Sequence, residues 1–272
     1  MMQPILTQAV INKYERWNRE CRLGVYRSFI DVLSSNTRGR GWICNSHVTG
    51  QRHHLLSTGE HRVLVTLLEK DPDMVAIQEQ FALDPRITMQ LARELDILHP
   101  GRFRFGNGRR EAVVMTTDFR VIKRNGGYAC LHIKGYSRPI PGQSEKVNGS
   151  KRRNEKKFRL EEAYWHSIGG ALGFIDSSTI SESHYQTLCQ TRRYAALKPT
   201  NEQVRAFFGA LKDVAEKNPG RPAKHLLLHI DATNPLLKGI TVPLFRHLIW
   251  AGRFPFDMSN TLNLNLPLGS ML

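Results

Sequence analysis

The chain has 272 residues and a formal net charge of +15, because 39 lysines and arginines outnumber 24 aspartates and glutamates. A hydrophobic share of 40% is enough for a packed core, which excludes an intrinsically disordered chain. The excess of cations favours a polyanionic partner, either nucleic acid or an anionic membrane surface, over a charge that serves only solubility.

Membrane and disulfide-rich classes are disfavoured by the rest of the composition. No apolar run approaches the roughly 18 residues of a membrane-spanning helix, and the first residues do not resemble a signal peptide. We therefore expect no membrane partner. The four cysteines lie far apart without a CxxC pair, which argues against a disulfide scaffold and a structural zinc site. This usage predicts a reducing, cytoplasmic setting.

In chain order, the first clear element is a helix. Residues 8–24 have only loose helical periodicity with a basic excess, and residues 27–52 are polar without a recognisable element. The stretch 57–60 then fits the capping-box pattern S-x-x-E that begins a helix. Apolar residues follow at helical spacing over 63–68, and Asp71-Pro72 ends the predicted helix.

The next part of the chain predicts four strands. The predicted elements are a strand at 74–83, a helix at 87–97, an arginine-rich loop at 98–110, and a hairpin with strands at 113–122 and 128–136. The hairpin turn is Asn125-Gly126-Gly127, whose residues tolerate the positive φ of a tight turn. A basic segment at 138–159, a helix at 155–167 and a strand at 171–175 follow. This order predicts a mixed α/β fold with a central sheet flanked by helices.

The character of the sequence changes after about Asp176. Helices are predicted at 181–192, 201–217, 221–230 and 244–253, and the tail at 262–266 alternates like a strand. Several short helices followed by a β tail indicate a small, mainly helical domain of winged-helix type.

The hairpin carries three side chains suited to phosphodiester chemistry. Asp118 lies within its first strand, where aspartate is depleted and an unpaired carboxylate is costly, so it is a candidate metal ligand. His132 and Lys134 share one face of the second strand, about 7 Å apart. The lysine would neutralise a phosphate or orient water, and the histidine would bind a metal or transfer a proton. The alternatives are solvated edge positions for Asp118 and Lys134, and a polar gap filled by His132.

Two further acids are candidates for the same site. Glu60 stands at the third position of the predicted helix, where it either caps the helix or faces Asp118 and binds a metal. Glu79, in the strand 74–83, competes for that role. Hard oxygen ligands hold Mg²⁺, which neutralises phosphate charge and activates water. The set therefore predicts a metal-dependent phosphodiesterase.

Five short motifs give the chain a resemblance to a known family. They are HHLLSTGE (53–60), VAIQEQFAL (75–83), MTTDF (115–119), LHIK (131–134) and EEAYW (161–165). In this order and spacing they resemble the TnsA endonucleases, the subunits of heteromeric cut-and-paste transposases that cut the 5′ ends of the element. The resemblance covers about residues 50–176. Over 177–272 it depends on position and helical character only.

The resemblance implies a restriction-endonuclease-like catalytic domain at 1–176, with 1–52 as a basic N-terminal extension, and a helical, winged-helix-like domain at 177–272 for partner contact. On it, Glu60 matches the family's helix glutamate, Asp118 its metal-binding aspartate and Lys134 its catalytic lysine. His132 stands where a family member has glutamine, and the backbone carbonyl of Ile133 is the expected further ligand. The implied cofactor is Mg²⁺, with Mn²⁺ as a substitute.

The implied function is Mg²⁺-dependent cleavage of one strand at each transposon end in the bacterial cytoplasm. The implied partners are transposon-end DNA, a DDE-type transposase subunit (TnsB-like) and an AAA+ ATPase regulator (TnsC-like). Two alternatives remain open. One is a stand-alone restriction or junction nuclease, and the other is a DNA-binding adaptor with an inactive nuclease core, which the departure at His132 leaves open.

Overall fold

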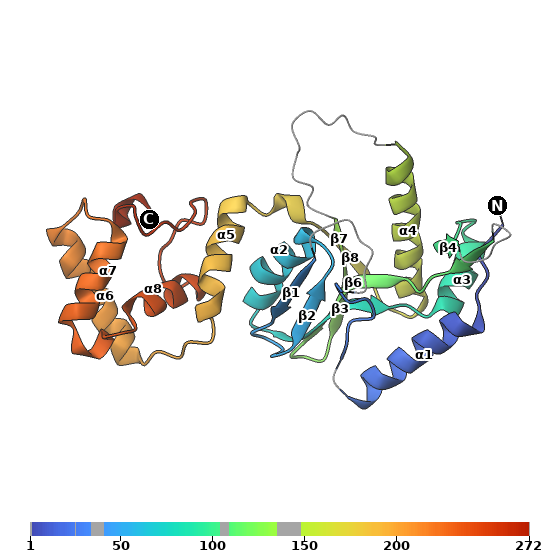
Figure 1. The fold of residues 1–272 in the computed structure, drawn as a ribbon, viewed down its shortest axis with the longest axis horizontal. Helices are drawn as coiled ribbons and strands as arrows, with labels where there is room; N and C mark the ends of the chain where they lie inside the picture. Colours follow the sequence, from blue (N-terminus) through green and yellow to red (C-terminus); the bar gives the residue numbers. More distant parts are fainter. Residues whose placement is uncertain (1, 25, 34–40, 104–108, 135–147, 272) are drawn as a thin grey trace. The chain divides into compact units, whose positions relative to one another are not determined.

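The computed structural model describes residues 2–24, 26–33, 41–103, 109–134 and 148–271, with the backbone alone for 148–153 (Figure 1). The chain divides into two compact units, one formed by residues 1–64 with 68–178 and the other by 65–67 with 179–272. Each is described by itself. In the described part of the chain, no helix combines the length and apolar character needed to cross a membrane.

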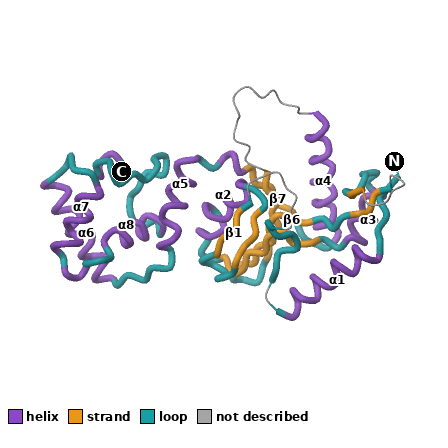
Figure 2. Tube along the Cα trace, viewed as in Figure 1, coloured by secondary structure: helices purple, strands orange, loops and turns teal. Residues whose placement is uncertain are grey.

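A four-stranded mixed sheet is the centre of the first unit (Figure 2). Its order is β3 (Met74–Ala82), β6 (Thr116–Lys123), β7 (Tyr128–Lys134) and β8 (Leu172–Asp176). The pairs β3–β6 and β6–β7 are antiparallel, whereas β7–β8 is parallel. The predicted hairpin is confirmed: Gly126 has a φ of 81°, and the Lys123 amide donates to the Gly127 carbonyl over 2.9 Å. The predicted end of the second strand, at 135–136, lies outside the described residues.

Two helices cover the sheet. A parallel pair such as β7–β8 needs a crossover connection, and α4 (Asn148–Ser167) is its helical part. Helix α3 (Pro85–Glu94) packs against α4, and Asp84 caps it by accepting from the Arg86 amide at 2.9 Å. The shared core is apolar and consists of Leu83, Ala92, Met115, Cys130, Leu160, Tyr164 and Trp165. The prediction of a mixed α/β core is therefore confirmed.

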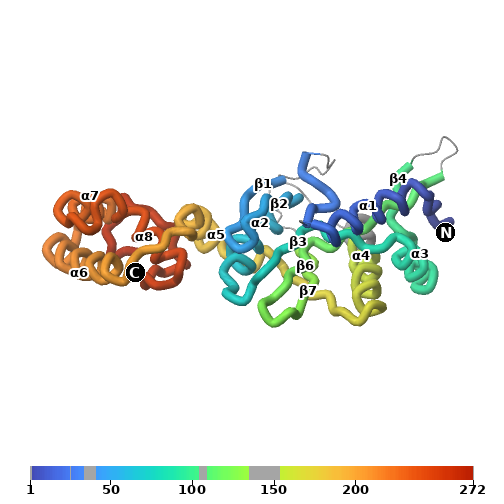
Figure 3. Tube along the Cα trace, turned by 90° about the horizontal axis from the view of Figure 1, so that it is seen from below, coloured from blue at the N-terminus to red at the C-terminus, as the bar shows by residue number. Residues whose placement is uncertain are grey.

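The N-terminal part of the chain contributes to this core. Residues 8–23 form α1 (Gln8–Leu23), which lies beside α3 (Figure 3). Its Tyr14 and Trp17 are buried against Ala82, and the Trp17 ring lies 5.3 Å from that of Phe81. Residues within the predicted basic extension 1–52 thus pack on strand β3.

Two small two-stranded ribbons in this unit were not predicted from the sequence. One pairs β1 (Trp42–Asn45) with β2 (Arg52–Leu55), and the other pairs β4 (Gly101–Phe103) with β5 (Arg110–Ala112). The predicted loop at 98–110 is therefore wrong at 101–103 and at Arg110, while 104–108 lie outside the described residues. The second ribbon is held by buried Glu111, which binds Arg102 at 2.9 Å and the Thr7 hydroxyl at 2.7 Å.

Two helix boundaries also differ from the predictions. The helix expected to reach Asp71 is instead α2 (Thr58–Thr66), followed by the short 3₁₀ helix η1 (Leu68–Lys70). Helix α4 begins at Asn148, seven residues before the predicted start at Glu155. The lysines and arginines of 151–159 therefore belong to a helix, whereas 138–147 lie outside the described residues.

The second unit is helical. Its α-helices are α5 (Glu182–Thr191), α6 (Asn201–Lys217), α7 (Ala223–Thr233) and α8 (Thr241–Trp250), which confirms a helical C-terminal region. The predicted strand at 262–266 is wrong. Leu262 is buried in the helical core, and the carbonyls of Leu264 and Leu266 accept from the amides of Lys224 and Ala223. The tail thus satisfies amides of the first turn of α7, which have no partner within the helix.

Candidate active site

Asp118 is held where β6 meets β7. The register that pairs Phe119 with Leu131 places Asp118 beside His132. Its carboxylate accepts a hydrogen bond from the Ile133 amide at 2.7 Å, and the His132 Nδ1 lies 3.8 Å away. The side chain keeps 19% exposure. Burial raises the pKa of Asp118, and the negative charge of Glu161 adds to the rise.

Glu60 lies at the start of α2, where the capping residues hold it in place. The Glu60 amide donates to the Ser57 hydroxyl at 3.1 Å, which confirms the predicted helix start. Its carboxylate accepts from the Leu56 amide at 2.8 Å and from the Ser57 hydroxyl at 3.1 Å. The residue is only 5% exposed. Burial, followed by the charge of Asp118, raises the pKa of Glu60 to about 8, so the two carboxylates repel each other.

Gln80 links the carboxylate of Glu60 to the sheet. Its side-chain amide donates to Glu60 at 3.4 Å, and its carbonyl oxygen accepts from the Thr116 hydroxyl at 2.9 Å. The backbone of Gln80 has a φ of 51°, in the left-handed region that a non-glycine residue rarely adopts. Strained conformations of this kind gather at functional sites. Here the strain accompanies a side chain directed at Glu60.

The repulsion between Glu60 and Asp118 predicts a dependence of stability on pH. Because the pKa of Glu60 is raised from 4.5 to about 8 in the folded protein, the folded state binds more protons between these values. Stability therefore falls as the pH rises from about 4.5 to 8. Glu60→Gln cannot titrate, so in EDTA its free energy of unfolding should fall less than that of the wild type between pH 5 and 9. Urea unfolding at a series of pH values measures both curves, and parallel curves would contradict the raised pKa of Glu60.

His132 is oriented by Glu161, a residue without a role in the sequence analysis. The Nδ1 of His132 lies 3.0 Å from a Glu161 carboxylate oxygen, and Glu161 on α4 is fully buried. The other carboxylate oxygen of Glu161 has no hydrogen-bond partner among the described residues. Burial alone would lower the pKa of His132, but the hydrogen bond and charge of Glu161, together with Asp118, raise it. The rings of Phe158 and Phe174 pack around the imidazole.

Lys134 lies at the exposed end of β7. Its ammonium group binds the carboxylate of Asp176 on β8 at 2.9 Å, and its side chain is 63% exposed. The hydrogen bond from Ser178, with that from Lys134, lowers the pKa of Asp176 to about 2. Lys134 therefore has a carboxylate partner in the parallel pair that joins β7 to β8.

Glu79 does not share this environment. It is buried, its carboxylate contacts the ring of His53, and it accepts from the His54 amide at 3.1 Å. Strand β2 thus supplies its partners. Of the two acids weighed beside Asp118, Glu60 is the one whose carboxylate interacts with it.

Comparison with known proteins identifies a relative in transposition. The chain is 32% identical over 140 residues to "Transposon Tn7 transposition protein TnsA" of Escherichia coli. This part of the chain is homologous to TnsA. The alignment covers 52% of this chain and 46% of TnsA, so the chain spans about half the length of the curated relative it matches. No protein-family model matches the chain. By its name, this relative is a transposition protein.

The residues present fit a divalent cation of the kind that a TnsA-like nuclease needs. Among the described residues, no three histidine, cysteine or acidic side chains form a ready metal centre. The carboxylates of buried Glu60 and half-buried Asp118 nevertheless repel each other and have raised pKa values, and a buried oxygen of Glu161 lacks a hydrogen-bond partner among the residues that the structure describes. Hard oxygen donors whose repulsion a cation would relieve are suited to Mg²⁺ or Mn²⁺.

Proposed function

We propose that the chain is the endonuclease subunit of a cut-and-paste transposase, which cuts the 5′ ends of a transposable element by Mg²⁺-dependent hydrolysis in the bacterial cytoplasm. The observation that carries the proposal is the electrostatic interaction between the carboxylates of buried Glu60 and half-buried Asp118 beside the sheet of a chain homologous in part to TnsA. The two units would then be a restriction-endonuclease-like catalytic domain and a winged-helix-like partner domain.

The proposed roles follow from the contacts of each group. Glu60, Asp118, His132 and the carbonyl of Ile133 would hold Mg²⁺ or Mn²⁺, which supplies charge neutralisation at the phosphate and a more acidic water. His132 directs Nδ1 at the Glu161 carboxylate, so Nε2 is the ring nitrogen that would be available to the cation, as in metal sites whose histidine is oriented by an acid. Glu161 is thus a positioning residue. Lys134 would place its ammonium group against the scissile phosphate or the attacking water.

The proposed partners extend those roles to a complete transposition reaction. Transposon-end DNA is the substrate, and the net charge of +15 suits it. A DDE-type transposase subunit would cut and join the 3′ ends, and an AAA+ ATPase would regulate the complex. We assign contact with the regulator to the helical unit.

Strand-specific cleavage tests this function. Transposon-end duplexes labelled on one strand at a time are incubated with the chain, Mg²⁺ and the transposase encoded beside it. We expect cleavage at the 5′ end of the element only when both proteins and Mg²⁺ are present. Cleavage by the chain alone would instead indicate a stand-alone nuclease. Normal 3′ cutting with no 5′ cleavage would indicate an inactive adaptor, and either result contradicts the proposal.

A further inference from the structure

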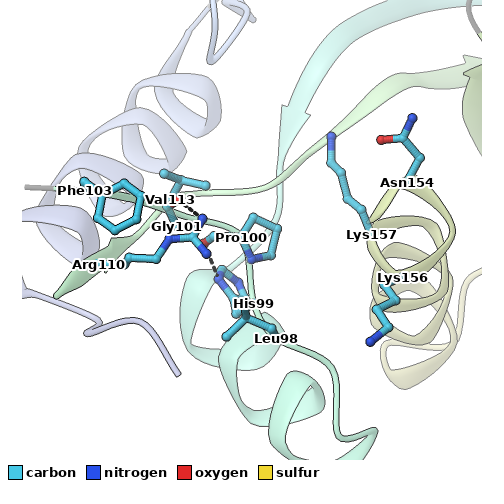
Figure 4. Close-up of a pocket in the computed structure, with 10 residues that line it drawn as sticks. All are labelled: Leu98, His99, Pro100, Gly101, Phe103, Arg110, Val113, Asn154, Lys156 and Lys157. Carbon is cyan, nitrogen blue, oxygen red and sulfur yellow. Dashed lines mark hydrogen bonds between the residues drawn. The ribbon is translucent and has the colours of Figure 1, made fainter. Parts of the chain in front are cut away.

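A cavity of about 920 Å³ lies between the β4–β5 ribbon and α4 (Figure 4). The ribbon side contributes Pro100, Phe103 and Arg110, and α4 contributes Asn154, Lys156 and Lys157. This volume is in the range of sites that take ligands of small-molecule size, roughly 300–1,000 Å³. The cavity is too small for a duplex, and its lining includes three cationic side chains, Arg110, Lys156 and Lys157.

The ribbon wall carries an aromatic ring that the fold leaves accessible. Phe103 is 77% exposed, although burying a phenylalanine is favourable. The Arg110 guanidinium lies over this ring, 5.5 Å from its centroid, and donates to the Gly101 carbonyl. An exposed ring beside cationic side chains is the combination on which proteins stack unpaired bases while they bind the phosphates.

Helix α4 connects the cavity with the candidate active site. One face of the helix carries Asn154, Lys157, Phe158 and Glu161. Each of them has another member of the set three or four residues away, and residues at these spacings are neighbours on a helix. The first two line the cavity, whereas Phe158 packs on the His132 ring and Glu161 contacts its Nδ1. The positive charge of Lys157 also reaches this site, because it opposes the rise in the pKa of Asp118 and of His132. A strand bound at His132 and Asp118 therefore has a cationic path along α4 into the cavity.

We propose that this cavity binds an unpaired stretch of the DNA strand next to the cleavage position, with a base stacked on Phe103 and the phosphates at Lys156 and Lys157. The proposal rests on the proposed function for its substrate. Bases of an intact duplex are stacked on one another, so their faces cannot reach Phe103. The site would thus favour DNA ends with an unpaired extension. An acidic peptide would satisfy the lysines but has no use for the exposed ring.

Binding without cleavage tests the proposal. Fluorescence anisotropy in EDTA compares a blunt duplex with the same duplex carrying a four-thymidine extension on either strand. We expect the wild type to bind one extended duplex at least about five-fold more tightly, since stacking of one base contributes at least that much. Phe103→Ala should bring the ratio close to one, whereas Phe103→Trp should preserve it. Lys156→Gln with Lys157→Gln should weaken binding of both duplexes and lower the salt dependence.

Matched controls separate this site from general basic surface. Tyr128→Ala removes another exposed aromatic ring that lies beneath an arginine, and Lys212→Gln removes an exposed lysine of α6. Both should keep the wild-type ratio. A wild-type ratio near one, or a ratio that Phe103→Ala leaves unchanged, would overturn the proposal. Polyglutamate that competes equally well with the blunt duplex and with the extended duplex would also overturn the proposal. The binding assay contains no Mg²⁺ and measures no cleavage, so a chain that fails to cut can still show the preference, and failure of the nuclease function and failure of the cavity are distinguishable.

Discussion

Replacing Asp118 with asparagine should lower the rate of 5′-end cleavage by about a thousand-fold, the size expected when a preorganised electrostatic contact at the reacting phosphate is lost. The amide is almost the same size, so it can keep the hydrogen bond from the Ile133 amide but not the negative charge. The measurement is single-turnover cleavage of a labelled transposon end with saturating protein, Mg²⁺ and the partner transposase.

A second aspartate provides the matched control for this variant. Asp213 is exposed on α6, in the helical unit, and Asp213→Asn should cleave at the wild-type rate. The 3′ cleavage by the transposase should persist in both variants, which shows that the complex still forms. A cleavage rate for Asp118→Asn within a few-fold of the wild type would remove Asp118 from the catalytic group.

Replacing Lys134 with methionine should lower the cleavage rate by about a hundred-fold, the lower range for a positioned group that helps proton transfer. Methionine keeps much of the length of the side chain without its charge. Because Lys134 also binds Asp176, the loss of the ion pair must be separated from the loss of catalysis. Asp176→Asn removes the anion and leaves the lysine, so it should retain more activity than Lys134→Met.

The ion pair alone is not expected to affect folding strongly. Lys134 is 63% exposed, and exposed pairs contribute little to stability. Both variants should therefore unfold at nearly the wild-type temperature. Equal losses of activity in Lys134→Met and Asp176→Asn would mean that the pair positions β7 and β8, and that the lysine has no separate role in the reaction.

Local signals in the sequence predicted the parts of the site that local interactions form. The helix start at Ser57–Glu60 and the turn at Asn125–Gly127 are each determined within four residues, and both are confirmed. The strand pattern also placed Asp118 and His132 on the two strands of one hairpin, and the register then brings them side by side. The catalytic roles of these residues stay predictions until activity is measured.

Interactions between distant segments could not be predicted in the same way. Glu161 reaches His132 only because α4 crosses from β7 to the parallel strand β8, and nothing within the motif EEAYW indicates which acid faces the sheet. The alternating leucines of the tail equally fit a strand or a segment packed on helices. They pack on helices because amides of the first turn of α7 have no acceptor within that helix and donate to carbonyls of the tail.

The central claim is that Glu60 and Asp118 together bind the cation, and thermal unfolding with and without Mg²⁺ tests it most directly. A ligand that binds only the folded state stabilises it, so at about 100 times Kd the melting temperature should rise by roughly 5 °C or more. We predict this rise for the wild type and for Asp213→Asn, and its loss in Glu60→Gln and Asp118→Asn. An equal rise in all four proteins would contradict a shared cation site at these two carboxylates.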